Sequence, residues 1–386
     1  MKTIMIIGAG KAQVPLIEAA TREGYHTVVC DLNPDAPGVR LAGEYCKIST
    51  RDRDGLFRTA QEKKIDGIVA NSEYAMCDVA AISSGLGLVG NPESAIAILS
   101  SKSKFRALQQ QIGLFAPKVG KELDYPLIIK PDMNSGTRGT AVANDEAGVK
   151  DAVETCSILS RNGKAIVEEY IPIDPETVIE GEIFIHNGNI LWDGLFRSIR
   201  GKAAPMIPMT YMFPLAEERV DELKAALEAA FQAAGVLHGE YNIEACFVDD
   251  KPFIIEINPR QGGNDLPRYV MEHCGIDYYR LLVTTSVGDD EYWESLHNHQ
   301  RKNRYLIHHM LYPHADGIFK GIVIDDSILD CVCHTHLDAD IGSRIKKVSD
   351  GSCDIGYVDL VFQNSVKQMQ VAMQIEDLIQ IEIGQV

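Results

Sequence analysis

Short apolar segments alternate with amphipathic helical segments over residues 1–90. After the first apolar run, Val14, Ile17 and Ala20 recur at the spacing of one helix face, and Gly24 ends that predicted helix. Strands that alternate with helices favour a parallel, doubly wound sheet. The predicted strands are Lys2–Ile7, Tyr25–Cys30, Ile65–Ala70 and Leu86–Val89.

The tripeptide Asn91-Pro92-Glu93 has the composition of a helix start. Asn is a favoured N-cap, Pro suits the first helical position, and Glu complements the positive end of the helix dipole. A second helix is expected over about Lys102–Ile112, ending at Gly113.

Beyond the hinge-like pair Ala116-Pro117, the pattern changes to that of antiparallel strands. Asn187-Gly188 stands between two apolar runs and predicts a hairpin. A helix is expected over about Glu217–Ala234, and another near Ser365–Ile379 among several strands of the last segment. The remaining predicted strands are Leu127–Lys130, Ala165–Glu169, Glu182–His186, Ile190–Trp192, Tyr241–Val248 and Phe253–Ile257.

Composition narrows the classes of function. The chain has 386 residues, enough for two or three domains, and its net charge of −18 would repel a phosphate backbone or an anionic membrane. We expect no signal peptide, because the apolar run at the N-terminus stops at glycines, and no apolar run of the sequence is long enough to span a membrane. The nine cysteines are odd in number and scattered along the chain, a pattern that is typical of reduced thiols. We therefore expect a cytoplasmic protein that binds neither nucleic acid nor membrane.

Two motifs leave alternatives open. Cys331, Cys333, His334 and His336 suggest a metal site, but they alternate as in a strand and lack a second ligand pair at zinc-finger spacing. A strand followed by Gly8-Ala9-Gly10, with an Asp about twenty residues on, suggests dinucleotide binding. The third glycine of that fingerprint is missing, which argues against an NAD-dependent oxidoreductase.

The strongest chemical signal is the pair Glu244 and Glu256. If the turn between their strands centres on Asp250, both lie six residues from it and face each other across a hairpin. Like charges directly opposite are destabilising, so a buried pair of this kind calls for a cation such as Mg²⁺. Asn258 falls on the same face as Glu256, and Arg260, two residues further, could grip a phosphate or carboxylate.

Upstream residues fit a nucleotide. Lys130 ends an apolar strand, where an ammonium is well placed to meet a phosphate. The segment that follows, with Ser135, Gly136, Thr137 and Gly139, is small, polar and able to aim backbone N–H groups at phosphates, although a flexible surface hairpin would look the same. Arg197 and Arg200 could likewise meet an anion or lie in a solvated basic loop. Arg268, after the Gly262-Gly263 turn, is another candidate near the metal strand.

Together these segments resemble the ATP-grasp superfamily of carboxylate–amine ligases, including biotin carboxylase-like and L-amino acid ligase-like members. The resemblance covers about residues 1–290 and is most specific at Glu-Ile-Asn-Pro-Arg, residues 256–260, with Glu244 twelve residues before. Lys102 sits in a segment similar to the family's lysine-bearing helix pair, and Lys130 in one similar to its second ATP lysine segment.

The resemblance implies further site residues. Residues 166–171 are similar to the family's hinge strand, which meets adenine, and this implies Glu168, Glu169, Tyr170 and Ile171 as cofactor-binding residues. Glu176 is implied as the ribose partner. The implied metal ligands are Glu244, Glu256 and Asn258, and the implied catalytic residues are Arg260 and Arg268.

The resemblance also implies an architecture: a Rossmann-like domain over 1–95, an ATP-grasp domain over 96–300 with a lid over about 117–172, and a small C-terminal domain over 301–386. The implied activity uses ATP with Mg²⁺ or Mn²⁺ to convert a carboxylate to an acyl phosphate and join it to an amine. The partners would be small-molecule carboxylates and amines, with a homodimer possible. A bicarbonate-activating carboxylase and a non-catalytic nucleotide-binding protein are the alternatives.

Overall fold

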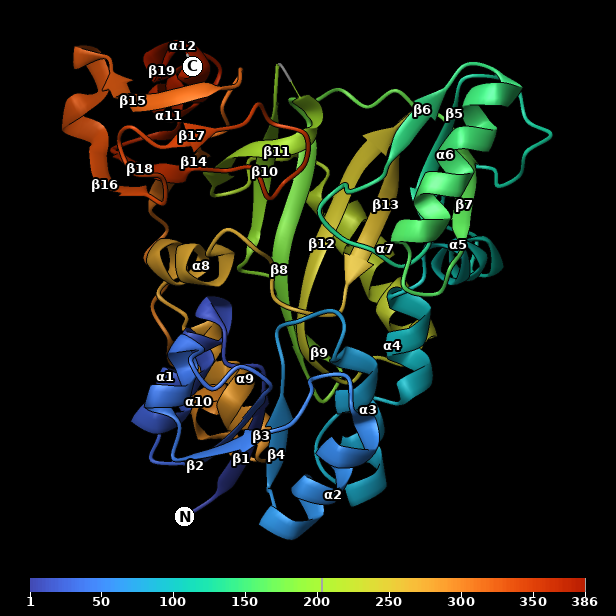
Figure 1. Ribbon diagram of the computed structural model, residues 1–386, viewed down its shortest axis with the longest axis vertical. Coiled ribbons are helices and arrows are strands. Elements are labelled where there is room, and N and C mark those ends of the chain that lie inside the picture. Colours follow the sequence, from blue (N-terminus) through green and yellow to red (C-terminus); the bar gives the residue numbers. More distant parts are fainter. Residues whose placement is uncertain (203, 386) are drawn as a thin grey trace.

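The computed structural model describes residues 1–202 and 204–385 (Figure 1). The first α/β unit is a parallel sheet of order β3-β2-β1-β4, which confirms the doubly wound prediction. Its elements are β1 (Thr3–Ile7), α1 (Val14–Arg22), β2 (His26–Asp31), β3 (Glu44–Lys47), α2 (Arg53–Lys63), β4 (Gly67–Val69) and α3 (Met76–Leu86).

The prediction of a strand at Leu86–Val89 is wrong. Leu86 ends α3, and Gly87 follows in the left-handed conformation that commonly terminates a helix. Leu88 nevertheless packs against the core beneath the sheet, which explains its apolar character without strand pairing. The additional strand of this sheet is β3, an edge strand of mixed polarity that the apolar pattern missed.

Asn91 is not a helix cap, in contrast to the sequence prediction. Helix α4 (Glu93–Leu99) begins after Pro92, with no side-chain cap. The Asn91 amide instead accepts hydrogen bonds from the backbone N–H groups of Leu237 and His238, and donates to the His238 carbonyl. It thus ties the first α/β unit to the start of a central strand. Helix α5 (Lys102–Gln111) then begins at Ser101, whose hydroxyl caps it.

A small subdomain follows, at the upper right of Figure 1, in the segment predicted to be a lid, and we refer to it as the lid. Its three antiparallel strands have the order β6-β5-β7, and one helix packs against them. The elements are β5 (Leu127–Pro131), β6 (Ala141–Ala143), α6 (Glu146–Leu159) and β7 (Ala165–Glu169).

The centre of the molecule is a large antiparallel sheet of order β13-β12-β8-β10-β11-β14-β18-β16, with β9 paired to β8. The Asn187-Gly188 hairpin is confirmed, because β8 and β9 pair on either side of it. The strands are β8 (Val178–His186), β9 (Asn189–Leu191), β10 (Leu195–Gly201), β11 (Ala204–Phe213), β12 (His238–Val248), β13 (Lys251–Asn258), β14 (Tyr305–Met310), β16 (Val332–Leu337) and β18 (Gly356–Phe362).

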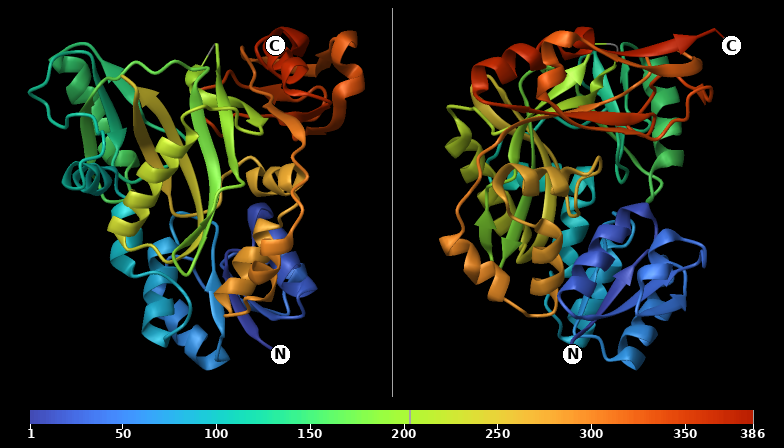
Figure 2. Two further views of the ribbon diagram at one scale, coloured as in Figure 1. Left: turned by 180° about the vertical axis from the view of Figure 1, so that it is seen from behind. Right: turned by 90° about the vertical axis from the view of Figure 1, so that its left-hand side faces the viewer.

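The C-terminal segment therefore extends the central sheet, and it also forms a small sheet of order β17-β15-β19 (Figure 2). These strands are β15 (Gly317–Ile324), β17 (Arg344–Ile345) and β19 (Ile379–Gly384). The remaining helices are α7 (Val220–Ala234), α8 (Leu266–Cys274), α9 (Tyr278–Ser286), α10 (Glu291–Ser295), α11 (Ser365–Ala372) and α12 (Ile375–Leu378). In the part of the chain that the structure describes, no helix has the length and apolarity to cross a membrane.

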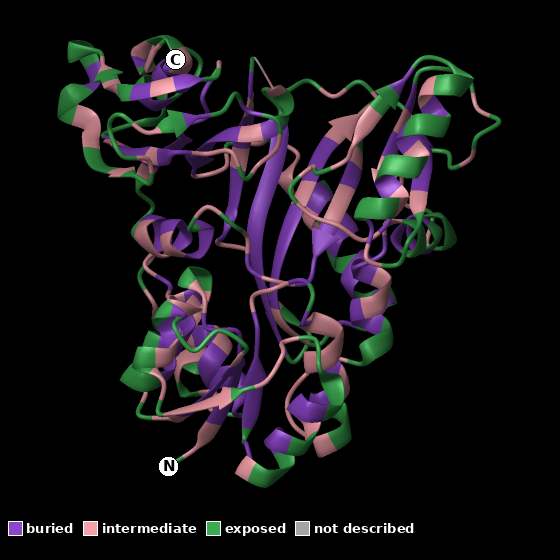
Figure 3. Cartoon of the chain, viewed as in Figure 1, coloured by how far each residue is buried: buried purple, intermediate pink, exposed green. Residues whose placement is uncertain are grey.

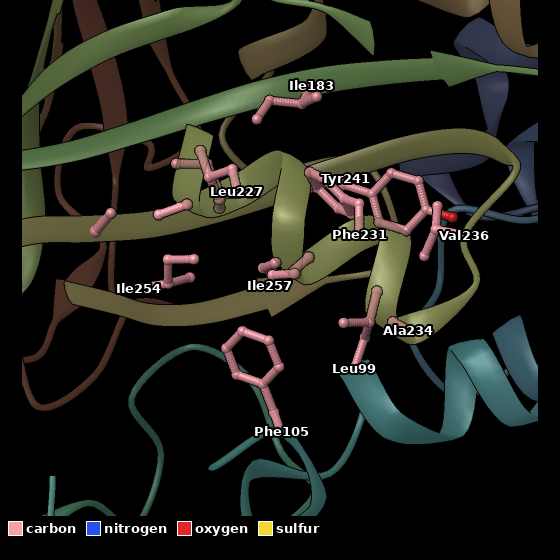
Figure 4. Close-up of a cluster of buried hydrophobic side chains, with 14 of the residues drawn as sticks. Leu99, Phe105, Ile183, Leu227, Phe231, Ala234, Val236, Tyr241, Ile254 and Ile257 are labelled. Atoms are coloured by element: carbon pink, nitrogen blue, oxygen red, sulfur yellow. The ribbon is translucent and has the colours of Figure 1, made fainter. Parts of the chain in front are cut away.

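The long central strands are buried along most of their length (Figure 3). Helix α7 covers one face, where Leu227 and Phe231 pack against Ile183 of β8 and Ile257 of β13 (Figure 4). Apolar burial of this kind contributes about 1.5–3 kcal/mol for each large side chain. The core therefore gives β12 and β13 a rigid backing at the place where their polar residues gather.

Candidate active site

The hairpin of β12 and β13 places the two predicted acids as the sequence arithmetic requires. Glu244 pairs directly with Glu256, and the turn at Asp249 and Asp250 has both residues in the left-handed conformation. A bulge immediately after Glu244 interrupts the regular register. The two carboxylates consequently sit side by side on the face of the sheet turned toward the lid.

A cleft of about 910 Å³, part of it open to solvent, lies between the lid and this hairpin. Nine of the sequence-predicted site residues line it: Lys102, Lys130, Ser135, Gly136, Thr137, Tyr170, Ile171, Glu244 and Glu256. Its apolar walls come from both sides, for example Ile128 of the lid and Ile255 of β13. Mixed apolar walls with a few converging charges are typical of a nucleotide-sized ligand site.

Lys102 and Glu256 form an ion pair in the floor of the cleft. The Lys102 ammonium lies 3.0 Å from a Glu256 carboxylate oxygen, and the two side chains are only 17% and 18% exposed. Burial alone would raise the pKa of Glu256, but the charge of Lys102 and a hydrogen bond from Asn258 outweigh it and lower the pKa to about 2. Glu256 is therefore a carboxylate at every physiological pH.

Lys130 is held by Glu168, which is itself completely buried. Glu168 accepts from Lys130 at 2.8 Å and from the Arg106 guanidinium at 2.7 Å. Burial opposes ionisation of Glu168, yet the two cations overcome it and lower its pKa to about 2. Arg106 also donates to the carbonyl of Ile255 on β13, so this cluster fastens α5 and the lid to the hairpin.

Arg200 completes the set of charges in the cleft. It lies on β10, and its guanidinium is 2.8 Å from Glu244. Of the two interpretations of this segment, a solvated basic loop is wrong, because Arg197 and Arg200 both lie within a strand of the central sheet. Arg197 points elsewhere, to the carbonyls of Glu176 and Ala216.

Glu180 lies beside Glu244 and Arg200. The family resemblance matches Glu176 and Glu180 to a Glu-x-x-x-Glu motif, but the sequence prediction selected only Glu176 for the site. The strand neighbour of Glu180 in β12 is Glu244. Burial, followed by the charge of Glu244, raises the pKa of Glu180 to about 8. The signal that could have found it is its Glu-x-Glu spacing with Glu182 in a continuously buried strand, where acids need a partner.

The segment Asn134–Thr140 forms the mouth of the cleft on the lid side. Gly136 and Thr137 both have positive φ, of 70° and 60°, so the backbone turns sharply at this point. Gly139 stands outside the lining: a Cβ there would lie 2.6 Å from Leu159, so this glycine permits close packing of the loop on α6.

Four predicted residues have side chains outside the cleft. Glu168 lies beneath it with Arg106, and Glu169 faces away toward Lys118. Glu176 is exposed in the loop before β8. Asn258 is buried, donating to Glu256 at 2.9 Å, and so supports a cleft residue.

The two predicted arginines lie in separate places. Arg260 lines a second cavity of about 620 Å³, part of it open to solvent, between β4, α3 and the start of β12. One of its nitrogens donates to the Gln261 carbonyl. Arg268 lies on α8 against Glu272 and Asp359, over the rings of Tyr269 and Tyr357. Arg268 therefore contacts the C-terminal strands and not the cleft.

The paired acids fit a hard divalent cation. Among residues 1–202 and 204–385, no three His, Cys, Asp or Glu side chains converge so as to hold an ion unaided. Mg²⁺ does not require this, since it commonly takes one or two carboxylates together with substrate phosphates and water. Glu244 and Glu256 meet that description, because both line the cleft that the lysines enter.

Comparisons with known proteins agree with this geometry. Residues 115–262 match the family described as carbamoyl-phosphate synthase L chain, ATP binding domain. The carbamoyl phosphate synthase large chain of Thermotoga sp. is 24% identical over 327 residues, which cover 74% of this chain and 28% of the relative. The chain thus spans less than a third of the length of that relative.

Solved structures match over the full length. An L-amino acid ligase from Bacillus licheniformis superimposes with a TM-score of 0.81 at 20% identity, covering 100% of this chain and 99% of that one. A phosphoribosylglycinamide synthetase from Anaerococcus prevotii gives 0.73 at 21% identity, with 99% and 100% covered. The structural matches confirm that the chain has the ATP-grasp fold, and residues 115–262 are similar to the ATP-binding domain of the carbamoyl-phosphate synthase L chain.

Proposed function

We propose that this ATP-grasp chain is a ligase that uses ATP to phosphorylate a carboxylate and then joins the acyl group to an amine, releasing ADP and phosphate. One observation carries the proposal. Lys102 and Lys130 enter the same cleft as the opposed acids Glu244 and Glu256, so cationic and metal-binding groups converge on one volume. Phosphoryl transfer needs this combination, because its transition state spreads negative charge over the phosphoryl oxygens.

Each charged residue has a defined task in this proposal. Lys102 and Lys130 bind phosphate oxygens of ATP, and Arg200 lies on the opposite wall. Glu244 and Glu256 would hold Mg²⁺, with Asn258 fixing the orientation of Glu256. Mg²⁺ bound there would neutralise charge on the phosphates. The pairs Lys102–Glu256 and Arg200–Glu244 bring every acid beside its cation before a substrate enters, so little reorganisation is required.

The lid excludes water from the intermediate. An acyl phosphate hydrolyses in water, so a ligase must cover it until the amine attacks. Here Ser135–Arg138 and Tyr170–Ile173 lie over the cleft from the lid side, opposite Glu244 and Glu256. Tyr170 and Ile171 supply the edge where adenine would lie, and the Glu168 side chain supports Lys130 from beneath.

Arg260 is assigned to the substrate carboxylate. It directly follows the metal strand, and only one of its guanidinium nitrogens has a bond to the described protein, at the Gln261 carbonyl. The other donors can form the two parallel hydrogen bonds that an arginine makes to a carboxylate or phosphate.

We further propose the domain boundaries given by the family resemblance. We also propose that the substrates are small molecules, that the protein is located in the cytoplasm and that it forms a homodimer.

The deciding experiment measures ADP release from MgATP with pooled amino acids and other small carboxylates, with and without an added amine. Hydroxylamine in a parallel reaction traps an acyl phosphate as a hydroxamate. ADP that appears only with a carboxylate, together with hydroxamate, supports the proposal. ADP release that requires bicarbonate alone would favour the carboxylase alternative. Nucleotide binding without ADP release under every condition would favour the non-catalytic alternative.

A further inference from the structure

A fully buried histidine lies between the C-terminal strands and the loop that follows the metal strand. His308, on β14, is 0% exposed. Its Nδ1 is 2.7 Å from an oxygen of Asp359, and its Nε2 is 3.0 Å from the backbone carbonyl of Asn264. Both ring nitrogens therefore have short contacts, and the proposed chemistry at the cleft uses neither of them.

The chemistry of the partner atoms decides the direction of the hydrogen bond to the loop. A backbone carbonyl can only accept a hydrogen bond, and the same is true of an ionised carboxylate. Burial opposes ionisation of Asp359, but hydrogen bonding to His308 and the charge of Arg268 outweigh it and lower its pKa. Both ring nitrogens of His308 thus lie against oxygen atoms, and Nε2 donates its hydrogen bond to the Asn264 carbonyl. Arg268 lies 3.2 Å from the second Asp359 oxygen and is also paired with Glu272.

The arrangement is built into the register of three neighbouring strands. His308 pairs with Tyr211 of β11 on one side and with Asp359 of β18 on the other. The Tyr211 ring stacks on His308, and Tyr269 and Tyr357 pack around it with ring centroids 4.2 and 4.7 Å away. These rings exclude water and hold the His308 ring in one orientation.

The contact to Asn264 restrains an energetically costly loop. Asn264 and Asp265 both have positive φ, of 56° and 55°, a conformation that non-glycine residues adopt at a cost of about 1–3 kcal/mol each. The Asn264 side chain also donates to the Tyr211 hydroxyl at 2.9 Å. The backbone of Asn264 is held by His308 and its side chain by Tyr211. The conformation of the loop therefore depends on these two buried residues.

This loop borders the proposed reaction centre. It begins directly after Arg260 and Gln261, and the Gly262 N–H donates to the buried Glu182. At its far end, the Tyr211 hydroxyl lies close enough to Glu180 and Glu244 for their charges to act on it. The segment Gly262–Asp265 therefore lies between the arginine assigned to the carboxylate and the acids assigned to the metal.

We propose that His308, together with Asp359 and Arg268, is a positioning residue that holds the loop Gly262–Asp265 in the conformation that receives the carboxylate substrate. The inference rests on the proposed function for the identity of that substrate. It gives Arg268 a role through Asp359 in place of direct contact with the reacting groups. It also explains why the C-terminal strands belong to the central sheet: they supply both His308 and Asp359.

Two substitutions separate the contacts of His308. The amide nitrogen of His308→Gln occupies the place of Nε2 and keeps the donor to Asn264. In His308→Asn the amide nitrogen occupies the place of Nδ1, so the donor to Asp359 is kept and the hydrogen bond to the Asn264 carbonyl is lost. His309→Asn is the matched control, because His309 is the next residue of the same strand, is equally buried and bonds Thr210.

We expect His308→Asn to raise the KM for the carboxylate by about tenfold or more, the effect of leaving a buried hydrogen-bond acceptor unpaired. The affinity for MgADP, measured by calorimetry, should stay within about threefold of wild type. Deuterium exchange in the peptide containing Gly262–Asp265 should increase in His308→Asn, but not in His308→Gln or His309→Asn. Equal behaviour of His308→Asn and His309→Asn in exchange and KM would overturn the inference.

A measurement on the wild-type chain covers the case in which these variants fold poorly. Nitrogen-15 labelling of the histidines should show one ring with a slowly exchanging proton on Nε2 at pH 7, and His308→Gln or His308→Asn at any soluble yield identifies its signal. A His308 ring without a proton on Nε2 would refute the inference, because it could not donate to the Asn264 carbonyl. If the wild type releases no ADP with any carboxylate, the proposed function fails, while the exchange and labelling measurements still decide whether His308 holds the loop.

Discussion

The Lys102 ammonium lies 3.0 Å from the carboxylate of Glu256, and this contact joins the first turn of α5 to β13 across the floor of the cleft. Glu244, directly opposite Glu256 in the hairpin, is paired with a different cation, Arg200. Two like charges that would repel each other are thus neutralised separately. Both pairs face the volume in which we place the phosphates of ATP.

The first prediction concerns Glu256→Gln. The substitution removes a proposed metal ligand and leaves the Lys102 ammonium without its carboxylate partner. We expect carboxylate-dependent ADP release to fall at least about 100-fold, since such charges act directly on the phosphoryl transition state. The measurement is a coupled assay at saturating MgATP, with urea unfolding to show that the chain is folded. Glu222→Gln, in an exposed ion pair with Arg219, serves as the control and should retain activity. Retained activity in Glu256→Gln would refute the metal assignment.

The second prediction concerns the buried cluster beneath Lys130. Arg106→Met removes the guanidinium that is 2.7 Å from Glu168, in a place where both side chains are 1% exposed. Removing one partner of a buried ion pair typically costs about 3–5 kcal/mol of unfolding free energy, because the other charge remains buried. Urea unfolding of Arg106→Met, Glu168→Gln and the double variant forms the test. We expect the double variant to lose less than the sum of the single losses; strict additivity would contradict a direct coupling.

The third prediction concerns pH and stability. Burial raises the pKa of both Glu182 and Glu240, which lie beneath Gly262 and Gln261, and the charge of Glu182 raises that of Glu240 further. Above their ordinary pKa of 4.5, the folded chain keeps protons that the unfolded chain releases. The unfolding free energy therefore falls as pH rises above 4.5, by up to about 1.4 kcal/mol per pH unit for each retained proton.

Glu240→Gln tests this relationship. The amide cannot ionise, yet its oxygen still accepts from Gln261. We expect a shallower decline of the unfolding free energy between about pH 5 and 8 than in the wild type. Glu228→Gln, exposed on α7, should leave the pH profile of the wild type unchanged. If the pH profile of Glu240→Gln ran parallel to that of the wild type, the pair Glu182 and Glu240 would retain no extra proton on folding.

Sequence reasoning was most successful where the decisive contacts are local. Counting from a short turn centred on Asp250 predicted the Glu244–Glu256 pairing correctly. In the structure the turn pairs Val248 with Lys251, and the bulge after Glu244 adds the one residue that brings the two acids opposite each other. The pairing of β14 and β18 with the central sheet could not be found in this way, because it joins segments that are far apart in sequence. The same limit explains the solvated interpretation of Arg200, whose partner lies 44 positions away.

The last prediction concerns Asn91, whose amide joins the first α/β unit to β12. Its oxygen accepts from the N–H groups of Leu237 and His238 at 2.8 and 3.0 Å, and its nitrogen donates to the His238 carbonyl at 2.7 Å. Asn91→Ala leaves these backbone groups unpaired, and we expect a loss of about 2–3 kcal/mol of unfolding free energy.

Asn91→Asp distinguishes this clamp from a generic loss of packing. The carboxylate can still accept from both N–H groups, but it cannot donate to the His238 carbonyl. We therefore expect an unfolding free energy between those of the wild type and Asn91→Ala, measured in urea at pH 7. If Asn91 acted as a helix cap, as its sequence context suggests, Asn91→Asp would match the wild type, because Asn and Asp cap about equally well. A clear loss in Asn91→Asp thus separates the interdomain clamp from the cap.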